Sequence, residues 1–133
     1  MAETIRVRAR MSVWLLIAAI NGFLAVAAGA FGAHALQGRL DAHALTVFET
    51  GARYQMYHAL AMGLAAFAMR GAAVSLATIA ASLFLAGIVL FSGSLYLLAL
   101  TGARGFGIVT PFGGVAFLIG WIALAWAATR VAA

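Results

Sequence analysis

The feature that most constrains this chain is the spacing of its charges, which leaves four long stretches without a charged side chain. These stretches cover residues 11–38, 54–69, 71–103 and 105–129. Eight arginines and three acidic residues are the only charges in 133 residues, whereas a soluble domain of this length carries about 33. So few charges cannot cover the surface of a soluble globule. The chain is therefore predicted to be an all-α, polytopic membrane protein.

The lengths of the uncharged stretches predict four transmembrane helices. A helix that spans the hydrocarbon core needs about 20 residues. Three of the stretches are longer than this, and the stretch 54–69 is long enough if its helix begins a few residues earlier. The predicted spans are about 12–36, 52–69, 73–100 and 110–129. Thr110 is a good N-cap for the last of them, and Pro111 a good first helical residue, because the N–H that proline lacks is unpaired there anyway.

The N-terminal region has more than one interpretation. Residues 11–133 are predicted to form one domain, after a polar, basic and disordered leader at 1–10. Basic residues followed by an apolar run also resemble a signal peptide, but the run continues to Leu36, which is longer than the apolar core of a signal peptide. An uncleaved first span is therefore favoured. Met11 is an alternative natural start to Met1.

The segment 40–51 differs from the spans because its apolar residues occupy one face of a helix. Leu40, Ala44, Val47, Phe48 and Gly51 cluster on that face, opposite the charged and polar residues. The pattern predicts an amphipathic helix in the outer membrane interface between the first and second spans, with Asp41 as N-cap or first-turn acid. No proline separates this segment from the second span, so one helix bent near Gly51 is the alternative.

The distribution of arginines predicts the orientation. With the N-terminus in the cytoplasm, five arginines lie on the inner side and three on the outer side, together with two of the three acids. The inner set is Arg6, Arg8, Arg10, Arg70 and Arg130, and the outer set is Arg39, Arg53 and Arg104. Both termini are therefore predicted to be cytoplasmic.

Several kinds of chemistry lack support in the sequence. The net charge of +5 comes from scattered arginines without a basic stripe, so nucleic acid is not an expected partner. The chain has no cysteine, and its three histidines are not spaced to place two ligands on one helix face, so neither a metal nor a cofactor is expected. No G-x-S-x-G turn and no phosphate-binding loop is present, so the chain is not expected to be an enzyme.

Stripes of small residues run along the first and fourth spans at spacings of three and four. They consist of Ala18, Gly22, Ala25, Gly29 and Gly32 in the first span, and of Gly113, Ala116, Gly120, Ala123 and Ala127 in the fourth. Such stripes let membrane helices approach closely. They indicate packing within one bundle or, alternatively, a contact with another copy of the protein.

Polar residues gather at the start of the second span and within the third. The candidate polar cluster consists of Glu49, Arg53, Tyr54, Gln55, His58, Ser92 and Ser94. On a helical wheel Tyr54, Gln55 and His58 point into the bundle, where each polar group needs a partner. His58 is interpreted as a proton relay or headgroup ligand, or as a structural histidine bonded to a carbonyl or a serine. Asn21 and the serines are predicted to form bonds between helices, and Glu49 to pair with Arg53.

Five motifs in order resemble a known family. They are Gly29-Ala30-Phe31-Gly32-Ala33-His34, Phe48-Glu49-Thr50, Tyr54-Gln55-Met56-Tyr57-His58-Ala59, Phe91-Ser92-Gly93-Ser94-Leu95-Tyr96 and Thr110-Pro111-Phe112-Gly113-Gly114. Together they resemble the YgdD-type family of small bacterial inner-membrane proteins, whose eukaryotic relatives are the transmembrane protein 256-like proteins. The resemblance covers residues 11–126. It implies a four-span protein of the bacterial inner membrane, and it brings no activity that can be transferred.

These observations lead to one main functional hypothesis. The chain is predicted to be a non-enzymatic bundle that supports membrane integrity, lipid organisation or a larger membrane complex, with membrane lipids and further copies of itself as candidate partners. The alternative is a small transporter or proton-coupled carrier that uses the polar groups around His58. A carrier needs a water-accessible cavity at His58, whereas a scaffold is tightly packed there. A membrane enzyme has the least support.

Overall fold

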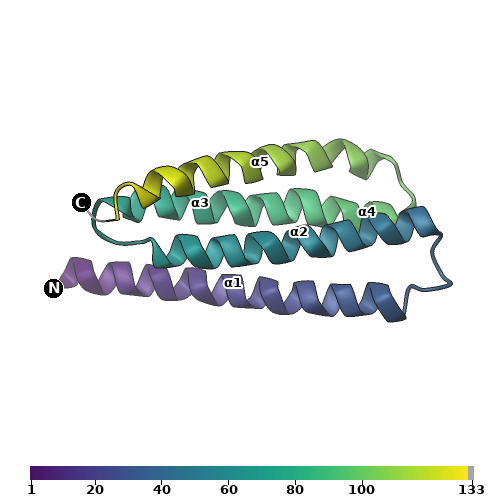
Figure 1. The fold of residues 1–133 in the computed structure, drawn as a ribbon, viewed down its shortest axis with the longest axis horizontal. Helices are drawn as coiled ribbons and strands as arrows, with labels where there is room; N and C mark the ends of the chain where they lie inside the picture. Colours follow the sequence, from purple (N-terminus) through teal and green to yellow (C-terminus); the bar gives the residue numbers. More distant parts are fainter. Residues whose placement is uncertain (132–133) are drawn as a thin grey trace.

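The computed structural model describes residues 1–131, and in that range four long helices lie side by side (Figure 1). They are α1 (Ala2–His34), α2 (Ala42–Phe67), a third helix built from η1 (Gly71–Ala73), α3 (Val74–Gly87), η2 (Ile88–Ser92) and α4 (Gly93–Thr101), and α5 (Gly105–Ala128). Three of the four are long and apolar enough to cross a membrane, namely α1, the third helix and α5. The chain is thus an all-α polytopic membrane protein.

The helices do not contribute equally to the core. α2, the third helix and α5 pack on one another, and the largest fully buried side chains, including Met62, Met69 and Phe84, lie among them. α1 packs almost entirely on α2 and buries only four of its residues, Ala18, Asn21, Ala25 and Gly32. α1 is therefore an edge helix, and most of its apolar surface faces outward (Figure 1).

The first ten residues differ from their prediction as a disordered leader. In the structure α1 begins at Ala2, so the basic leader forms the first turns of the helix that contains the first span. Neither glycine nor proline occurs before Met11, and alanine, glutamate and arginine are good helix formers. A helix that already exists in the span extends into such a segment at little cost, because only nucleation is unfavourable.

The predicted interfacial helix at 40–51 is also wrong, because these residues and the second span form the single 26-residue helix α2. Asp41 caps it, as predicted, by accepting a hydrogen bond from the backbone N–H of Ala44 at 2.7 Å. The apolar face of this segment packs inside the protein and not on lipid: the ring of Phe48 lies 6.2 Å from that of Phe31 and 4.8 Å from that of Tyr96. The alternative that this segment and the second span form one helix is confirmed, and the bend near Gly51 stays a prediction.

The last helix begins earlier than predicted. α5 begins at Gly105, so Pro111 lies inside the helix and Thr110 does not cap it. The N–H groups of Phe106 and Gly107 bond to carbonyls of the preceding loop, at Ala103 and Arg104, which lets the helix form before the proline. Membrane helices tolerate an internal proline when neighbouring groups compensate.

Both stripes of small residues pack within the chain. Gly32 lies against Phe48 of α2, and the buried Gly113 and Gly120 of α5 lie against Phe91 and Phe84 of the third helix. A methyl group at Gly113 would overlap the backbone nitrogen of Phe91, so the backbones of these two helices are nearly in contact. This confirms packing within one bundle for these positions. The stripes also contain half-buried members, namely Gly22, Gly29 and Ala116.

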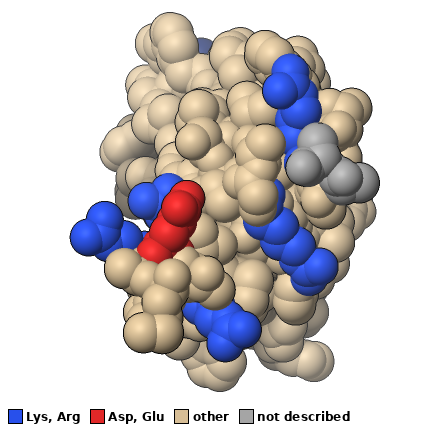
Figure 2. Space-filling view, turned by 90° about the vertical axis from the view of Figure 1, so that its left-hand side faces the viewer, with Lys and Arg blue, Asp and Glu red and all other residues tan. Residues whose placement is uncertain are grey.

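The two ends of the bundle differ in charge. Both termini and the turn between α2 and α3 lie at one end, which carries Arg6, Arg8, Arg10, Arg70 and Arg130 (Figure 1). Figure 2 looks onto this end and shows several arginine side chains around the one acidic residue there, Glu3. The five arginines that were predicted to share one side of the membrane are therefore together.

Candidate functional site

Gln55 of α2 is the hub of a hydrogen-bond network that joins three helices. Its Nε2 donates to Oδ1 of Asn21 in α1 at 3.3 Å, and its Oε1 accepts from the hydroxyl of Tyr96 in α4 at 2.7 Å. Asn21 in turn donates from Nδ2 to the carbonyl oxygen of Ile17 at 3.0 Å. Both ends of the buried Gln55 amide are thus occupied, and the predicted interhelical role of Asn21 is confirmed.

His58, one turn further along α2, uses both ring nitrogens. Its Nδ1 lies 2.8 Å from the carbonyl oxygen of Tyr54, and its Nε2 lies 3.2 Å from the indole Nε1 of Trp121 in α5. A carbonyl can only accept and an indole N–H can only donate, so Nδ1 carries the proton and Nε2 accepts. The two bonds together define a neutral imidazole, as in the interpretation of His58 as a structural histidine.

Aromatic rings enclose the His58 side chain. The ring of Phe117 stacks on it with centroids 3.4 Å apart and planes 5° apart, and that of Phe84 lies 5.7 Å away. His58 is 5% exposed. Its imidazole therefore belongs to a packed aromatic layer between α2, the third helix and α5.

The two serines of the third helix have different surroundings. Ser94 bonds through Oγ to the carbonyl oxygen of Phe91 at 2.9 Å and to Oγ1 of Thr110 at 2.7 Å, which joins α4 to α5. Ser92 is completely buried, and its Oγ has no hydrogen-bond partner among the described residues. Ser92 is the last residue of η2, a π-helical turn that offsets α4 from α3. π-turns of this kind are frequent at functional sites.

Substituting the two serines separately should give opposite results. Ser94→Ala removes a bond between helices and is expected to lower the free energy of unfolding by about 0.6 kcal/mol. Ser92→Ala removes a buried hydroxyl that has no partner, so it is expected to be neutral or stabilising. Thermal unfolding in mild detergent compares the two. A destabilised Ser92→Ala variant beside an unchanged Ser94→Ala variant would contradict both assignments.

The structure divides the predicted polar cluster among different faces of α2. Glu49 and Arg53 are exposed and line a hollow of about 300 Å³ on the α1 side, and neither side chain joins the bonds that link the helices. Gln55 faces α1 and α4, whereas His58 faces α5. Arg53 and Gln55 are two positions apart, about 200° around the helix, and the angle of about 60° between Gln55 and His58 is enough to turn them toward different neighbouring helices. The Glu49–Arg53 pair stays a prediction.

An aromatic pocket of about 660 Å³ lies beside His58 on the outer surface of α2 and α5. His58 itself lines it, together with Tyr54, Tyr57, Phe91, Pro111, Gly114, Val115, Phe117, Leu118 and Trp121. Its lining is mostly apolar, and Tyr57 and Trp121 are about half exposed. In a membrane this surface faces the lipid.

Besides Asn21, three partners in the network lie outside the predicted cluster. Tyr96 bonds to Gln55, Thr110 to Ser94, and Trp121 to His58. Tyr96 follows Ser92 by four residues, and residues at that spacing share a helix face. This spacing could have predicted that Tyr96 points toward the polar cluster. Thr110 was predicted as a helix cap, and the sequence contains no signal for its bond to Ser94 or for the bond of Trp121 to His58.

Comparisons with known proteins agree with the fold. Residues 28–114 match the family model described as "Protein of unknown function (DUF423)". The chain is 48% identical over 121 residues to the UPF0382 membrane protein YwdK of Bacillus subtilis, covering 90% of this chain and 98% of YwdK. It is 48% identical over 119 residues to the UPF0382 inner membrane protein YgdD of Escherichia coli, covering 88% and 89% of the two chains. No solved structure matches this chain significantly.

Proposed function

Because this chain belongs to the UPF0382/DUF423 family of bacterial membrane proteins, we propose that it is a non-enzymatic, four-span bundle of the inner membrane. Its role is to organise the surrounding lipid or to support a larger membrane complex. One observation carries this proposal: Gln55 and His58, the most polar groups of the bundle interior, both bond to neighbouring helices, and the second ring nitrogen of His58 bonds to the carbonyl of Tyr54 within α2. Groups used in this way hold helices together and are not free for chemistry.

In this proposal α2 also crosses the membrane, in addition to the three candidate spans, although it is less apolar than the other three helices. Its 26 residues have a length of about 39 Å, enough for the hydrocarbon core of about 30 Å. Its buried polar side chains meet partners inside the bundle, which removes most of the cost of placing them in a membrane. Arg53 is exposed and has a side chain long enough to reach toward the outer interface.

The arginine-rich end is the cytoplasmic end in the proposed orientation. Cytoplasmic segments of membrane proteins carry an excess of arginine, and both termini of this chain lie at that end (Figure 1). A reporter that is active only in the cytoplasm is therefore expected to be active when it is fused to either terminus.

Packing around His58 favours the bundle over a proton-coupled carrier. A relay needs a ring nitrogen that can exchange its proton with water, whereas both nitrogens of His58 are bonded and Phe117 stacks on the ring. Protonating Nε2 would set two donors, the imidazolium and the Trp121 indole, against each other. A proton shuttle at this position would first have to break the bond to α5.

Proton flux into liposomes tests the proposal. Liposomes containing the protein are expected to take up protons no faster than empty ones, and His58→Ala is expected to change only thermal stability, by about 1 kcal/mol. Tyr57→Ala is the matched control, since Tyr57 is on the same helix but has no interhelical bond among the described residues. Proton flux that His58→Ala abolishes while Tyr57→Ala preserves it would overturn the scaffold and favour the carrier.

A further inference from the structure

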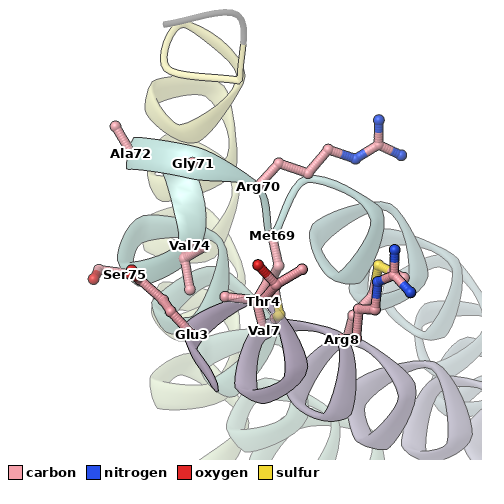
Figure 3. A pocket seen from close by; sticks show the side chains of 11 residues that line it. Glu3, Thr4, Val7, Arg8, Met69, Arg70, Gly71, Ala72, Val74 and Ser75 are labelled. Carbon is pink, nitrogen blue, oxygen red and sulfur yellow. The ribbon is translucent and has the colours of Figure 1, made fainter. Parts of the chain in front are cut away.

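A second pocket, of about 790 Å³, lies at the arginine-rich end of the bundle, away from the polar network. It opens between the first turns of α1 and the turn that joins α2 to α3 (Figure 3). Arg8 and Thr4 contribute from α1, and Arg70 and Ser75 from the turn and the start of α3. Two segments far apart in the sequence thus place two guanidinium groups and two hydroxyls around one hollow.

The charged side chains are arranged asymmetrically around this pocket. Figure 3 shows Arg8 and Arg70 extending to the same side, whereas Glu3 extends to the opposite side. Both arginines and Glu3 are exposed. The side with the two arginines therefore presents positive charge together with several N–H donors. Guanidinium groups bind phosphate oxygens with paired hydrogen bonds, more specifically than an ammonium group does.

The depth of the pocket matches the level of lipid headgroups. Its apolar lining includes Met11, the first residue of the uncharged stretch of α1, and Met69, the last residue of the uncharged stretch 54–69, in the turn after α2. Arg8 and Arg70 lie just beyond these methionines, where the hydrocarbon core ends and phosphates begin. The pocket is thus apolar toward the membrane and cationic toward water, as a phospholipid requires of its site.

We propose that this pocket binds the phosphate group of an anionic phospholipid, with Arg8 and Arg70 on the phosphate and the half-buried Met11 against the glycerol and the first acyl carbons. The inference rests on the proposed function, since it names the class of lipid that the bundle organises. Five arginines and one acid at this end favour a lipid with net negative charge over a zwitterionic one. Thr4, which lies between the two sides of the pocket in Figure 3, supplies a further donor to the headgroup.

Lipid binding to the intact protein tests the proposal by native mass spectrometry from mild detergent. The protein is titrated with phosphatidylglycerol and, separately, with phosphatidylethanolamine of the same acyl chains. The first bound phosphatidylglycerol is expected to be retained much better than phosphatidylethanolamine. The double substitution Arg8→Gln and Arg70→Gln is expected to weaken that first binding by about 30-fold. Each arginine near the membrane surface contributes about 1 kcal/mol to binding an anionic lipid, and about 1.4 kcal/mol corresponds to a tenfold change in the binding constant.

A matched variant separates a specific site from general attraction. Arg39→Gln with Arg104→Gln removes the same charge from exposed positions at the other end, and it is expected to leave the first binding constant unchanged. An equal loss in both double variants, or equal retention of the two lipids, would overturn the proposal. All four positions are exposed, so both variants are expected to keep the melting temperature of the parent.

Soluble phosphate is the other source of the same chemistry. Inorganic phosphate at millimolar concentration is added to the lipid-free protein in a separate arm, with the same two double variants. Retention of phosphate that depends on Arg8 and Arg70, without any preference between the two lipids, would overturn the lipid assignment. These outcomes are independent of proton flux, so the headgroup site and the scaffold can fail separately.

Discussion

Gly113→Ala is expected to lower the free energy of unfolding by about 1–3 kcal/mol, a large effect for one added methyl group. The methyl would overlap the backbone nitrogen of Phe91 and lie 2.7 Å from its Cβ. These atoms belong to η2, whose backbone is packed against α2 and α5. Neither a rotamer change nor a small side-chain shift can relieve the overlap, so the helices themselves must separate.

The adjacent glycine provides the control for this prediction. A methyl at Gly114 would meet its nearest neighbour, Cδ2 of Phe91, at 4.0 Å, which is ordinary contact. Both substitutions replace a glycine within α5 by a better helix former, so intrinsic propensity raises stability by the same amount in each, about 1 kcal/mol. Unfolding in mixed micelles is expected to rank Gly114→Ala above the parent and Gly113→Ala below it. Equal stabilities for the two variants would contradict the close approach of α5 to η2.

Phe84→Ala is expected to destabilise the bundle by about 2–4 kcal/mol. Phe84 is completely buried, and its ring lies 5.7 Å from that of His58 and 5.2 Å from that of Trp121. In a membrane the transfer of apolar surface from water contributes little, so most of the loss comes from packing contacts around the cavity. The missing ring also removes a wall of the aromatic layer that holds His58.

Phe23 allows the same change to be made outside the core. It lies on α1 and is 73% exposed, so in a membrane Phe23→Ala replaces lipid contacts and opens no cavity. The Phe23 variant is expected to unfold within about 0.5 kcal/mol of the parent. If the two variants lose equal stability, the core does not lie between α2, the third helix and α5.

Helix number and the ends of the third helix follow directly from the uncharged stretches. The prediction of 73–100 differs by only a few residues from the observed Gly71–Thr101, since Arg70 and Gly102 lie just outside the apolar run. The other helices extend beyond their predicted starts. Residues 2–10 and 42–50 contain neither glycine nor proline, so nothing in them ends a helix that continues from the adjacent span.

The polar cluster was predictable residue by residue but not as an arrangement. Gln55 and His58 point into the bundle, as the helical wheel predicts, whereas Tyr54, for which the wheel predicts the same, is 38% exposed. Which residues on other helices they bond to depends on how far those helices are shifted along the bundle axis relative to α2. No local sequence pattern specifies that shift. The π-turn η2 adds to this, because it rotates α4 relative to α3 and so determines whether Tyr96 reaches Gln55.

The position of α1 at the edge of the bundle has a consequence for biosynthesis. α1 leaves the ribosome first, and its one main partner, α2, is the next helix to follow. In the proposed four-span arrangement α2, the least apolar of the four, inserts together with α1 as a hairpin in which Gln55 bonds to Asn21. In that arrangement the bond that joins the two helices in the folded protein also assists membrane insertion, before the rest of the chain has been made.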